Sequence, residues 1–195
     1  MFIELTDHLR CPADHPEGYL VLLPDRMEDR SVREGRLGCP VCGRTYRVVE
    51  GVLDLGGGPG SPPGTTVLVP EALTALVGLS GPGGYLALVG RPASAWRDVA
   101  QRNPGVGLVA VNPAEDVVDE PGISVLRGGS LPLKSRSMRG VVLGAPYGHD
   151  PRWVAEGARV VLPGLRVAGE GEVPRPEAID VMASAGGAWV GTPRR

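Results

Sequence analysis

The sequence predicts an α/β protein with a doubly wound, mostly parallel sheet, preceded by a small β-rich module that a metal ion holds together. Two observations lead to this prediction. All three cysteines lie within the first 42 residues, in two short Cys-Pro turns. After residue 65, near-continuous apolar segments alternate with helical patterns, which is typical of a parallel sheet covered on both faces.

The first module is predicted to contain four short strands, at residues 19–23, 32–38, 45–49 and 52–55. Its two turns are Cys11-Pro12-Ala13-Asp14-His15 and Cys39-Pro40-Val41-Cys42-Gly43. So small a sheet buries too little apolar surface to fold without a staple, and a bound metal supplies one.

The two turns predict a single zinc site. Structural zinc takes four ligands in a tetrahedron, and short cysteine turns deliver them in pairs. Cys39 and Cys42 form one pair at C-x2-C spacing, whereas Cys11 is followed by His15 at C-x3-H spacing and by Asp14 at C-x2-D spacing. We expect Cys11, His15, Cys39 and Cys42 to be the ligands, because carboxylates are rare in structural zinc sites. Asp14 is the alternative to His15.

Two other interpretations of the cysteines stay open. Cys11 can be an ordinary buried thiol beside a redox pair or disulfide of Cys39 and Cys42, because C-x-x-C also occurs in redox motifs. The turns can also be the remnant of a site that has lost its metal. Three cysteines and no secretory signal argue against a disulfide framework.

Residues 57–65 are predicted to be a linker, because the chain from Gly56 to Gly64 consists only of Gly, Pro and Ser. Beyond it we expect helices at 71–79, 94–102, 151–162 and 177–185. The expected strands lie at 85–89, 107–111, 123–126, 140–143, 165–169 and 188–191. The predicted division is therefore a module of residues 1–56, a linker of 57–65 and an α/β domain of 66–195.

Composition narrows the classes of function. The 42% apolar content suits a packed core, and no apolar run reaches the roughly 18 to 20 residues that span a bilayer, so we expect a cytoplasmic protein. Residues 1–58 carry seven Arg against ten Asp and Glu. Nucleic acid is therefore not an expected partner, because phosphate binding usually needs a basic surplus. One Phe and three Trp also supply few surfaces on which bases could stack.

Three segments, residues 5–12, 37–42 and 46–55, together resemble the zinc-ribbon family of the small activator subunit of tRNA, rRNA and protein methyltransferases. The resemblance covers about residues 1–56 and includes both Cys-Pro turns and the Gly51-Val52 tail. It implies a zinc ribbon that adds a strand and an apolar surface to a partner protein. The family's second cysteine, where it is present, falls on Asp14.

Residues 66–195 resemble a class I methyltransferase that uses S-adenosylmethionine, at residues 72–90, 131–143 and 158–167. This resemblance implies a Rossmann-like fold, yet most of the family's cofactor-binding positions carry other residues. The first-strand acid falls on Leu88. The three glycines of the following turn fall on Gly90, Pro92 and Ser94. The ribose carboxylate falls on Asn112, and the adenine acid on Gly129. The resemblance with these changes implies that the cofactor is not bound.

Tyr147, His149 and Asp150 lie in the loop where this fold often carries catalytic residues. We interpret them as exposed loop residues, with Asp150 capping a helix that begins at Pro151. The expected function is a non-catalytic assembly, stabilising or docking subunit that binds zinc and a protein partner or a second copy of itself. The alternatives are an active methyltransferase acting on RNA or protein, and a nucleic-acid-binding zinc module, which the acidic first half disfavours.

Overall fold

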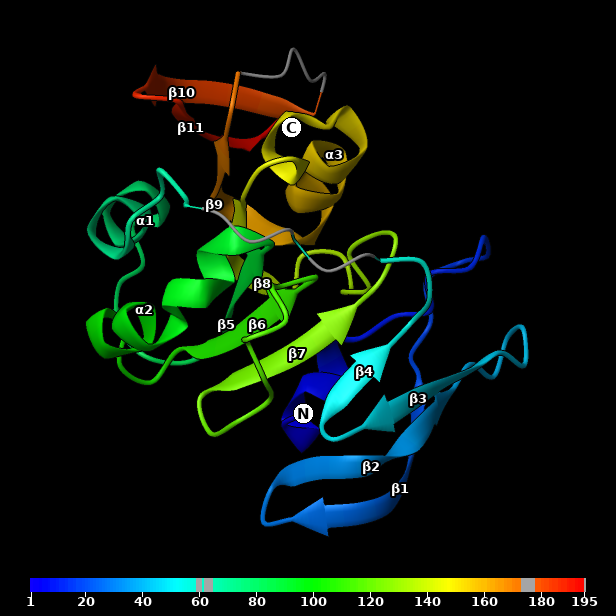
Figure 1. The fold of residues 1–195 in the computed structure, drawn as a ribbon. Coiled ribbons are helices and arrows are strands. Elements are labelled where there is room, and N and C mark those ends of the chain that lie inside the picture. Colours follow the sequence, from blue (N-terminus) through cyan, green and yellow to red (C-terminus); the bar gives the residue numbers. More distant parts are fainter. Residues whose placement is uncertain (59–60, 62–64, 173–177, 195) are drawn as a thin grey trace.

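The protein is described by a computed structural model that covers residues 1–58, 61, 65–172 and 178–194 (Figure 1). These residues form one eleven-stranded sheet with the strand order β1-β2-β3-β4-β7-β6-β5-β8-β9-β11-β10. The strands are β1 (Val21–Glu28), β2 (Ser31–Gly38), β3 (Thr45–Val49), β4 (Val52–Asp54), β5 (Tyr85–Val89), β6 (Gly107–Val111), β7 (Ile123–Arg127), β8 (Met138–Leu143), β9 (Val161–Glu170), β10 (Ile179–Ala185) and β11 (Ala188–Pro193). The helices are η1 (Ile3–His8), α1 (Pro70–Val77), η2 (Arg91–Ala95), α2 (Trp96–Arg102), η3 (Tyr147–His149) and α3 (Pro151–Val160).

The sheet is mixed rather than mostly parallel. The six central strands, β4-β7-β6-β5-β8-β9, pair in parallel. The meander β1 to β4 at one end and the strands β11 and β10 at the other end pair antiparallel. The predicted doubly wound arrangement is therefore present only in the centre of a longer sheet.

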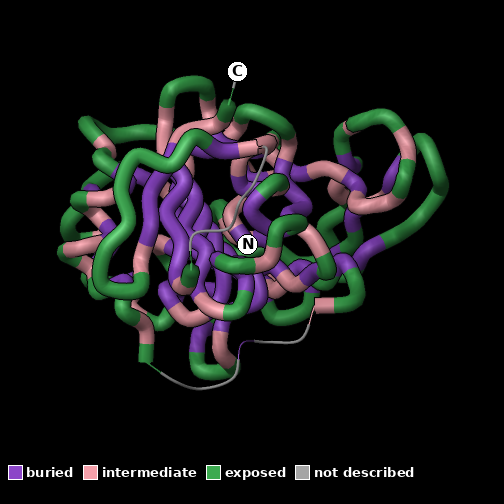
Figure 2. Tube along the Cα trace, turned by 90° about the horizontal axis from the view of Figure 1, so that it is seen from above, coloured by how far each residue is buried: buried purple, intermediate pink, exposed green. Residues whose placement is uncertain are grey.

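Both faces of the central strands are buried, as their unbroken apolar sequences predict. Helices α1 and α2 pack on one face, and α3 packs on the opposite face together with η1. Figure 2 shows the result, with buried strands surrounded by exposed connections. Helix α3 begins where predicted, because the carboxylate of Asp150 accepts a hydrogen bond of 2.8 Å from the backbone N–H of Arg152.

The two predicted halves share one sheet and one core. Strand β4 pairs in parallel with β7, so that Leu53 lies beside Leu126 and Asp54 beside Arg127. Val48 and Leu53 of the first half are buried in the same apolar cluster as Leu126 of the second. The apolar face of the small module is therefore covered within the chain, although the proposed division at residues 57–65 stays a prediction.

Three predicted elements differ in the structure. The expected helix at 177–185 is wrong, because β10 forms a hairpin with β11 and Ala185 pairs with Ala188 across Gly186 and Gly187; residue 177 itself lies outside the described residues. Helix α3 ends at Val160 instead of residue 162, and β9 begins at Val161, four residues before the predicted strand. The first strand is shifted along the chain and extends to Glu28, five residues further than predicted.

No helix in the described part of the chain is long and apolar enough to cross a membrane.

The shared core predicts a specific effect of truncating Leu53, which is fully buried at the junction of the two halves. Leu53→Ala should lower the free energy of unfolding by about 2–5 kcal/mol, because it leaves a cavity. Val49 lies on β3, the other strand of the same hairpin, and is 46% exposed. Val49→Ala should therefore lower the free energy of unfolding by less than about 1 kcal/mol. Urea denaturation followed by circular dichroism measures both. Equal effects would contradict a core that both halves share.

Candidate metal centre and cofactor crevice

The structure brings the four predicted zinc ligands together. The sulfur atoms of Cys11, Cys39 and Cys42 and a ring nitrogen of His15 all lie within 4.8 Å of one another. The Sγ atoms of Cys11 and Cys42 are 3.7 Å apart, and Sγ of Cys39 lies 3.4 Å from Nε2 of His15. Asp14 is exposed and does not belong to this group.

These distances fit a tetrahedral zinc ion. Bonds of about 2.3 Å to sulfur and about 2.0 Å to nitrogen place the ligand atoms of a tetrahedron roughly 3.5–3.8 Å apart. All three cysteines are free thiols, and a Cys11–Cys42 sulfur separation of 3.7 Å is too long for a disulfide bond. The cluster can therefore hold a metal ion, and its three sulfurs and one imidazole are compatible with zinc. Bound there, zinc would staple the two turns together without taking part in a reaction.

Hydrogen bonds orient these ligands. The carbonyl of Pro16 can only accept, so Nδ1 of His15, 2.8 Å away, carries the proton and Nε2 is free to bind metal. Tyr46 Oη lies 3.0 Å from Sγ of Cys11. Burial acts to raise the pKa of the Cys11 thiol, but hydrogen bonds, that from Tyr46 first, hold this pKa below its ordinary value. A lowered thiol pKa favours the thiolate that zinc binds.

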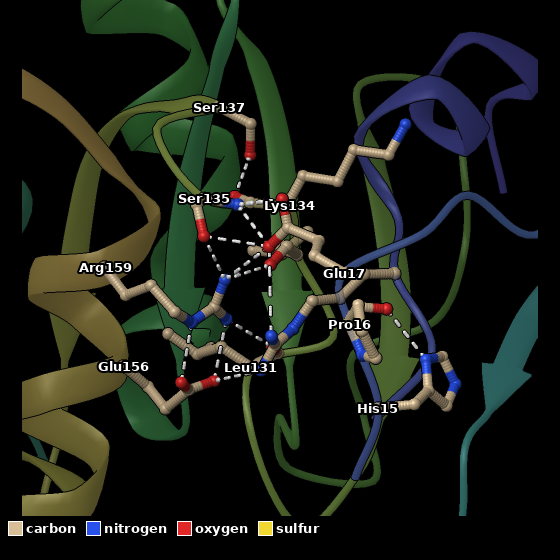
Figure 3. Close-up of polar contacts among 11 residues, drawn as sticks. His15, Pro16, Glu17, Leu131, Lys134, Ser135, Ser137, Glu156 and Arg159 are labelled. Atoms are coloured by element: carbon tan, nitrogen blue, oxygen red, sulfur yellow. Dashed lines mark hydrogen bonds and ion pairs between the residues drawn. The ribbon is translucent and has the colours of Figure 1, made fainter. Parts of the chain in front are cut away.

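The first Cys-Pro turn is also fastened to the second half of the chain (Figure 3). Glu17, two residues after His15, accepts hydrogen bonds of 3.0 Å from the backbone N–H and 2.8 Å from the hydroxyl of Ser135. Arg159 of α3 lies 3.4 Å from Glu17 and forms two 2.7 Å hydrogen bonds with Glu156. Burial opposes ionisation of Glu17, but the Ser135 hydrogen bonds and the charge of Arg159 hold its pKa below the usual range.

Main-chain hydrogen bonds reinforce this junction. The N–H of Arg10 donates to the carbonyl of Pro132 at 3.0 Å, and the N–H of Lys134 donates to the carbonyl of His8 at 2.8 Å. Arg10 also lies 3.5 Å from Glu156. Sequence reasoning did not identify this network, because it joins residues more than a hundred positions apart.

The second candidate site is the crevice at the carboxyl ends of the parallel strands. Strands β6 and β7 extend from β5 in one direction, and β8 and β9 extend in the other. In open α/β sheets a ligand binds outside the strand ends where the order reverses in this way. Six positions of this chain correspond to cofactor-binding residues of the resembled family. Five of them follow the ends of β5, β6 and β7: Gly90, Pro92, Ser94, Asn112 and Gly129. The sixth, Leu88, is fully buried inside β5.

Side chains of the protein occupy the start of this crevice. Gly90 has a φ of 75°, and a Cβ built on it would lie 2.8 Å from the hydroxyl of Ser61 and 3.0 Å from the ring of Tyr147. Pro92 is buried, and its ring packs so closely against Gly144 that residue 144 has no room for a Cβ atom. Ser94 is exposed. The turn after β5 is therefore covered by three of the protein's own side chains.

The next turn is closed by Asn112. This residue is 1% exposed, and its side-chain amide donates to the carbonyl of Gly128 at 2.8 Å and accepts from the same residue's N–H at 2.9 Å. Gly58 lies directly on Asn112 and Gly128, and the N–H of Gly129 donates to the carbonyl of Gly56 at 3.2 Å. The described part of the predicted linker thus runs across the strand ends, while residues 59–60 and 62–64 lie outside the described residues.

The buried carboxylate of Glu170, which the sequence did not predict as a functional group, holds the chain just after the predicted linker. Glu170, at the end of β9, accepts hydrogen bonds from Thr66 and from the backbone N–H groups of Val67, Leu68 and Ala145. It is 4% exposed. A glutamate that ends an apolar strand is the only signal in the sequence that could have identified it.

Tyr147, His149 and Asp150 line one small pocket together with Pro146 and Trp153. Tyr147, expected to be exposed, is buried and packs edge-on against Trp153 with ring centroids 4.5 Å apart. His149 is exposed. The backbone N–H of Arg152 and its guanidinium hold the pKa of Asp150 below its usual range, although the small burial of Asp150 opposes them.

A scan of family models gives no match, and a search of curated proteins gives none either. Solved structures with a similar fold include a candidate methyltransferase from an antibiotic biosynthesis pathway of Anabaena variabilis, at 19% identity over 54% of this chain and 45% of that chain, with a TM-score of 0.44. A complex of the Haloferax volcanii Trm112 methyltransferase activator with a methyltransferase matches at 19% identity over 45% of each chain, with a TM-score of 0.39. This chain therefore spans less than half of the length of those matched chains.

A third similar structure, a candidate hemolysin from Streptococcus thermophilus, matches at 14% identity over 77% of this chain and 75% of that chain, with a TM-score of 0.40. With TM-scores of 0.39 to 0.44, these likenesses carry no conclusion about this chain.

The geometry of the metal cluster predicts about one zinc ion per chain. His15→Ala and Cys39→Ser should each weaken zinc binding by at least about tenfold and lower the thermal midpoint, because metal binding stabilises the fold. Asp14→Ala, the matched control in the same turn, should change neither. Elemental analysis and competition with a chromogenic chelator measure the zinc content and affinity. Fresh protein without metal, or equal effects of the Asp14 and His15 variants, would contradict these ligands.

Proposed function

We propose that this protein is a non-catalytic assembly, stabilising or docking subunit, built from a zinc ribbon and a methyltransferase-like domain that no longer binds its cofactor. The observation that carries the proposal is the packing of the crevice at the ends of β5, β6 and β7. Ser61, Pro92, Asn112 and Tyr147 pack in this crevice.

The amide of Asn112 at the crevice supports this proposal, because it is already bonded within the chain. Both ends of the Asn112 amide bond to Gly128, and Asn112, which replaces the family's ribose carboxylate, is only 1% exposed. The buried hydroxyl of Ser61 has no hydrogen-bond partner among the described residues. Pro92 has no N–H to offer and is wedged against Gly144. A cofactor would have to break these contacts and would then lack the charge-assisted hydrogen bonds that are worth roughly 1.5–3 kcal/mol each.

The arrangement of the first half supports an interaction role. In the resembled zinc-ribbon family, the ribbon adds a strand and an apolar surface to a partner. Here β4 adds to β7 of the same chain. We propose that the chain is a fused pair of activator and methyltransferase-like parts, and that the fused unit acts on a protein partner or on a second copy of itself.

The alternative is an active S-adenosylmethionine-dependent methyltransferase acting on RNA or protein. The calorimetry described below distinguishes it from the proposed function. The methyltransferase names of the similar structures suggest this activity, but likenesses of this size carry no conclusion about this chain.

Isothermal titration calorimetry of the zinc-loaded protein with S-adenosylmethionine and S-adenosylhomocysteine tests the proposal. We expect no binding tighter than about 100 μM, which corresponds to about 5.5 kcal/mol. The zinc content and thermal midpoint of the same sample show that the protein is folded. Tight binding of either compound, weakened by Asn112→Ala and not by the exposed control Ser94→Ala, would contradict the proposal and favour the enzyme.

A further inference from the structure

Three arginines, one each on β2, β3 and β7, lie in register on the outer face of the sheet, with Asp54 of β4 between the last two. The strand registers place Arg36 of β2 beside Arg47 of β3, Arg47 beside Asp54 of β4, and Asp54 beside Arg127 of β7. Their neighbours in sequence are buried, so these side chains lie on one solvent-facing side of the sheet. We call Arg36, Arg47 and Arg127 the arginine row.

The guanidinium groups of this row form no ion pair or hydrogen bond with any described residue. Other arginines of the same strands do: Arg26 and Arg33 form ion pairs with Glu28, Glu34 and Glu50. Asp54 lies within the row, yet its carboxylate accepts from its own turn, at the N–H of Gly56. The carboxylates of Glu28, Glu34, Glu50 and Asp54 are thus bound to groups outside the arginine row.

The pairing of Arg36 with Arg47 has an unfavourable electrostatic energy. Directly opposed residues of antiparallel strands hold their Cβ atoms about 4.5–5.5 Å apart, and like charges at that separation destabilise the sheet. Arg47 also lies opposite Asp54, whose negative charge offsets part of this repulsion. A ligand carrying negative charge would convert the repulsion into attraction.

The helices leave this side of the sheet open. The apolar cluster that includes α1 and α2 covers β5 to β7, and none of its buried members comes from β1, β2 or β3. Apolar side chains border the row instead: Leu23 pairs with Arg36 and is 53% exposed, while Val21 and Val49 are 42% and 46% exposed. The face therefore combines fixed positive charge with apolar surface.

A partner would have to approach this face rather than the neighbouring sheet edge. Strand β1 is the edge, but it carries Pro24 and irregular pairing between Pro24 and Met27. A proline and a bulge are features that prevent another strand from adding to an edge.

We infer that the arginine row, with Leu23 and Val49, is a docking surface for an acidic, partly apolar segment of a partner protein; this inference rests on the proposed docking function. Arginine is enriched in protein interfaces and binds carboxylates with two parallel hydrogen bonds. A nucleic-acid backbone fits less well, because apolar Leu23 and Val49 border the row and Tyr19 is the one large exposed aromatic side chain among the described residues.

Fluorescence anisotropy with the zinc-loaded full-length protein tests this inference. The probe is a labelled peptide of about twelve residues with glutamate at alternate positions and leucine or serine between them, so that an extended chain presents its carboxylates on one side. The double variant Arg36→Ser/Arg47→Ser should bind the peptide at least tenfold more weakly. The control Arg152→Ser/Arg194→Ser removes two exposed charges near the other end of the sheet and should leave binding unchanged.

Thermal denaturation separates docking from folding. The Arg36/Arg47 variant should be about as stable as the original protein, because it removes both the repulsion between the two arginines and the attraction of Arg47 to Asp54. A lower midpoint that accompanies the loss of binding would assign the row a structural role and overturn the inference. Undetectable peptide binding, or binding that the double variant does not weaken, would also overturn it.

Two further measurements test the occupant. A uridine oligonucleotide of equal charge that binds more tightly through the same arginines would assign the face to nucleic acid. Self-association in sedimentation velocity that the double variant abolishes would assign it to a second copy of the chain. Either result overturns the choice of a protein segment. None of these outcomes depends on the calorimetry, which judges the loss of the cofactor separately.

Discussion

The short parallel pairing of β4 with β7 is the contact on which the rest of the structure depends. It joins two residue pairs, Leu53 with Leu126 and Asp54 with Arg127, and so few hydrogen bonds would not hold two independent modules together. The pairing persists because it also buries apolar side chains of both halves in one core. The chain that leaves β4 runs directly across the ends of β6 and β7, where Gly58 lies on Asn112. The segment that follows β4 therefore both leaves the junction of the halves and covers the crevice.

The metal cluster lies beside this junction and acts on it through short connections. The turn that holds Cys11 and His15 is followed immediately by Glu17, whose carboxylate bonds to Ser135 and to Arg159 of α3. Partly buried charges of this kind contribute only when their geometry is fixed, because desolvation offsets most of their attraction. A metal ion that fixes the turn would fix Glu17 as well. A metal ion in the cluster would thereby help to hold the second half of the chain, in addition to joining the two Cys-Pro turns.

Sequence predicted the parts of this protein that depend on local chemistry, and missed those that depend on distant partners. Cysteine spacing indicated the residues that the structure gathers into one cluster, and apolar runs predicted the central strands. The segment 177–185 was predicted to be helical because its apolar residues suit a helix, yet Gly186 and Gly187, with φ values of 61° and 77°, form a two-residue turn that pairs β10 with β11. Glu170 and the Glu17–Arg159 contact could not be predicted, since each joins residues about 100 or more positions apart.

The distribution of satisfied and unsatisfied polar groups indicates where this protein acts. At the strand ends, the amide of Asn112 and the carboxylate of Glu170 form hydrogen bonds within the chain. Such groups stabilise a packed interior and offer little to a ligand. Arg36 and Arg47 are the opposite case, since they face each other without a partner among the described residues and repel. The proposed binding surface is therefore the outer face of β2 and β3, where charge stays without a partner, and not the packed crevice.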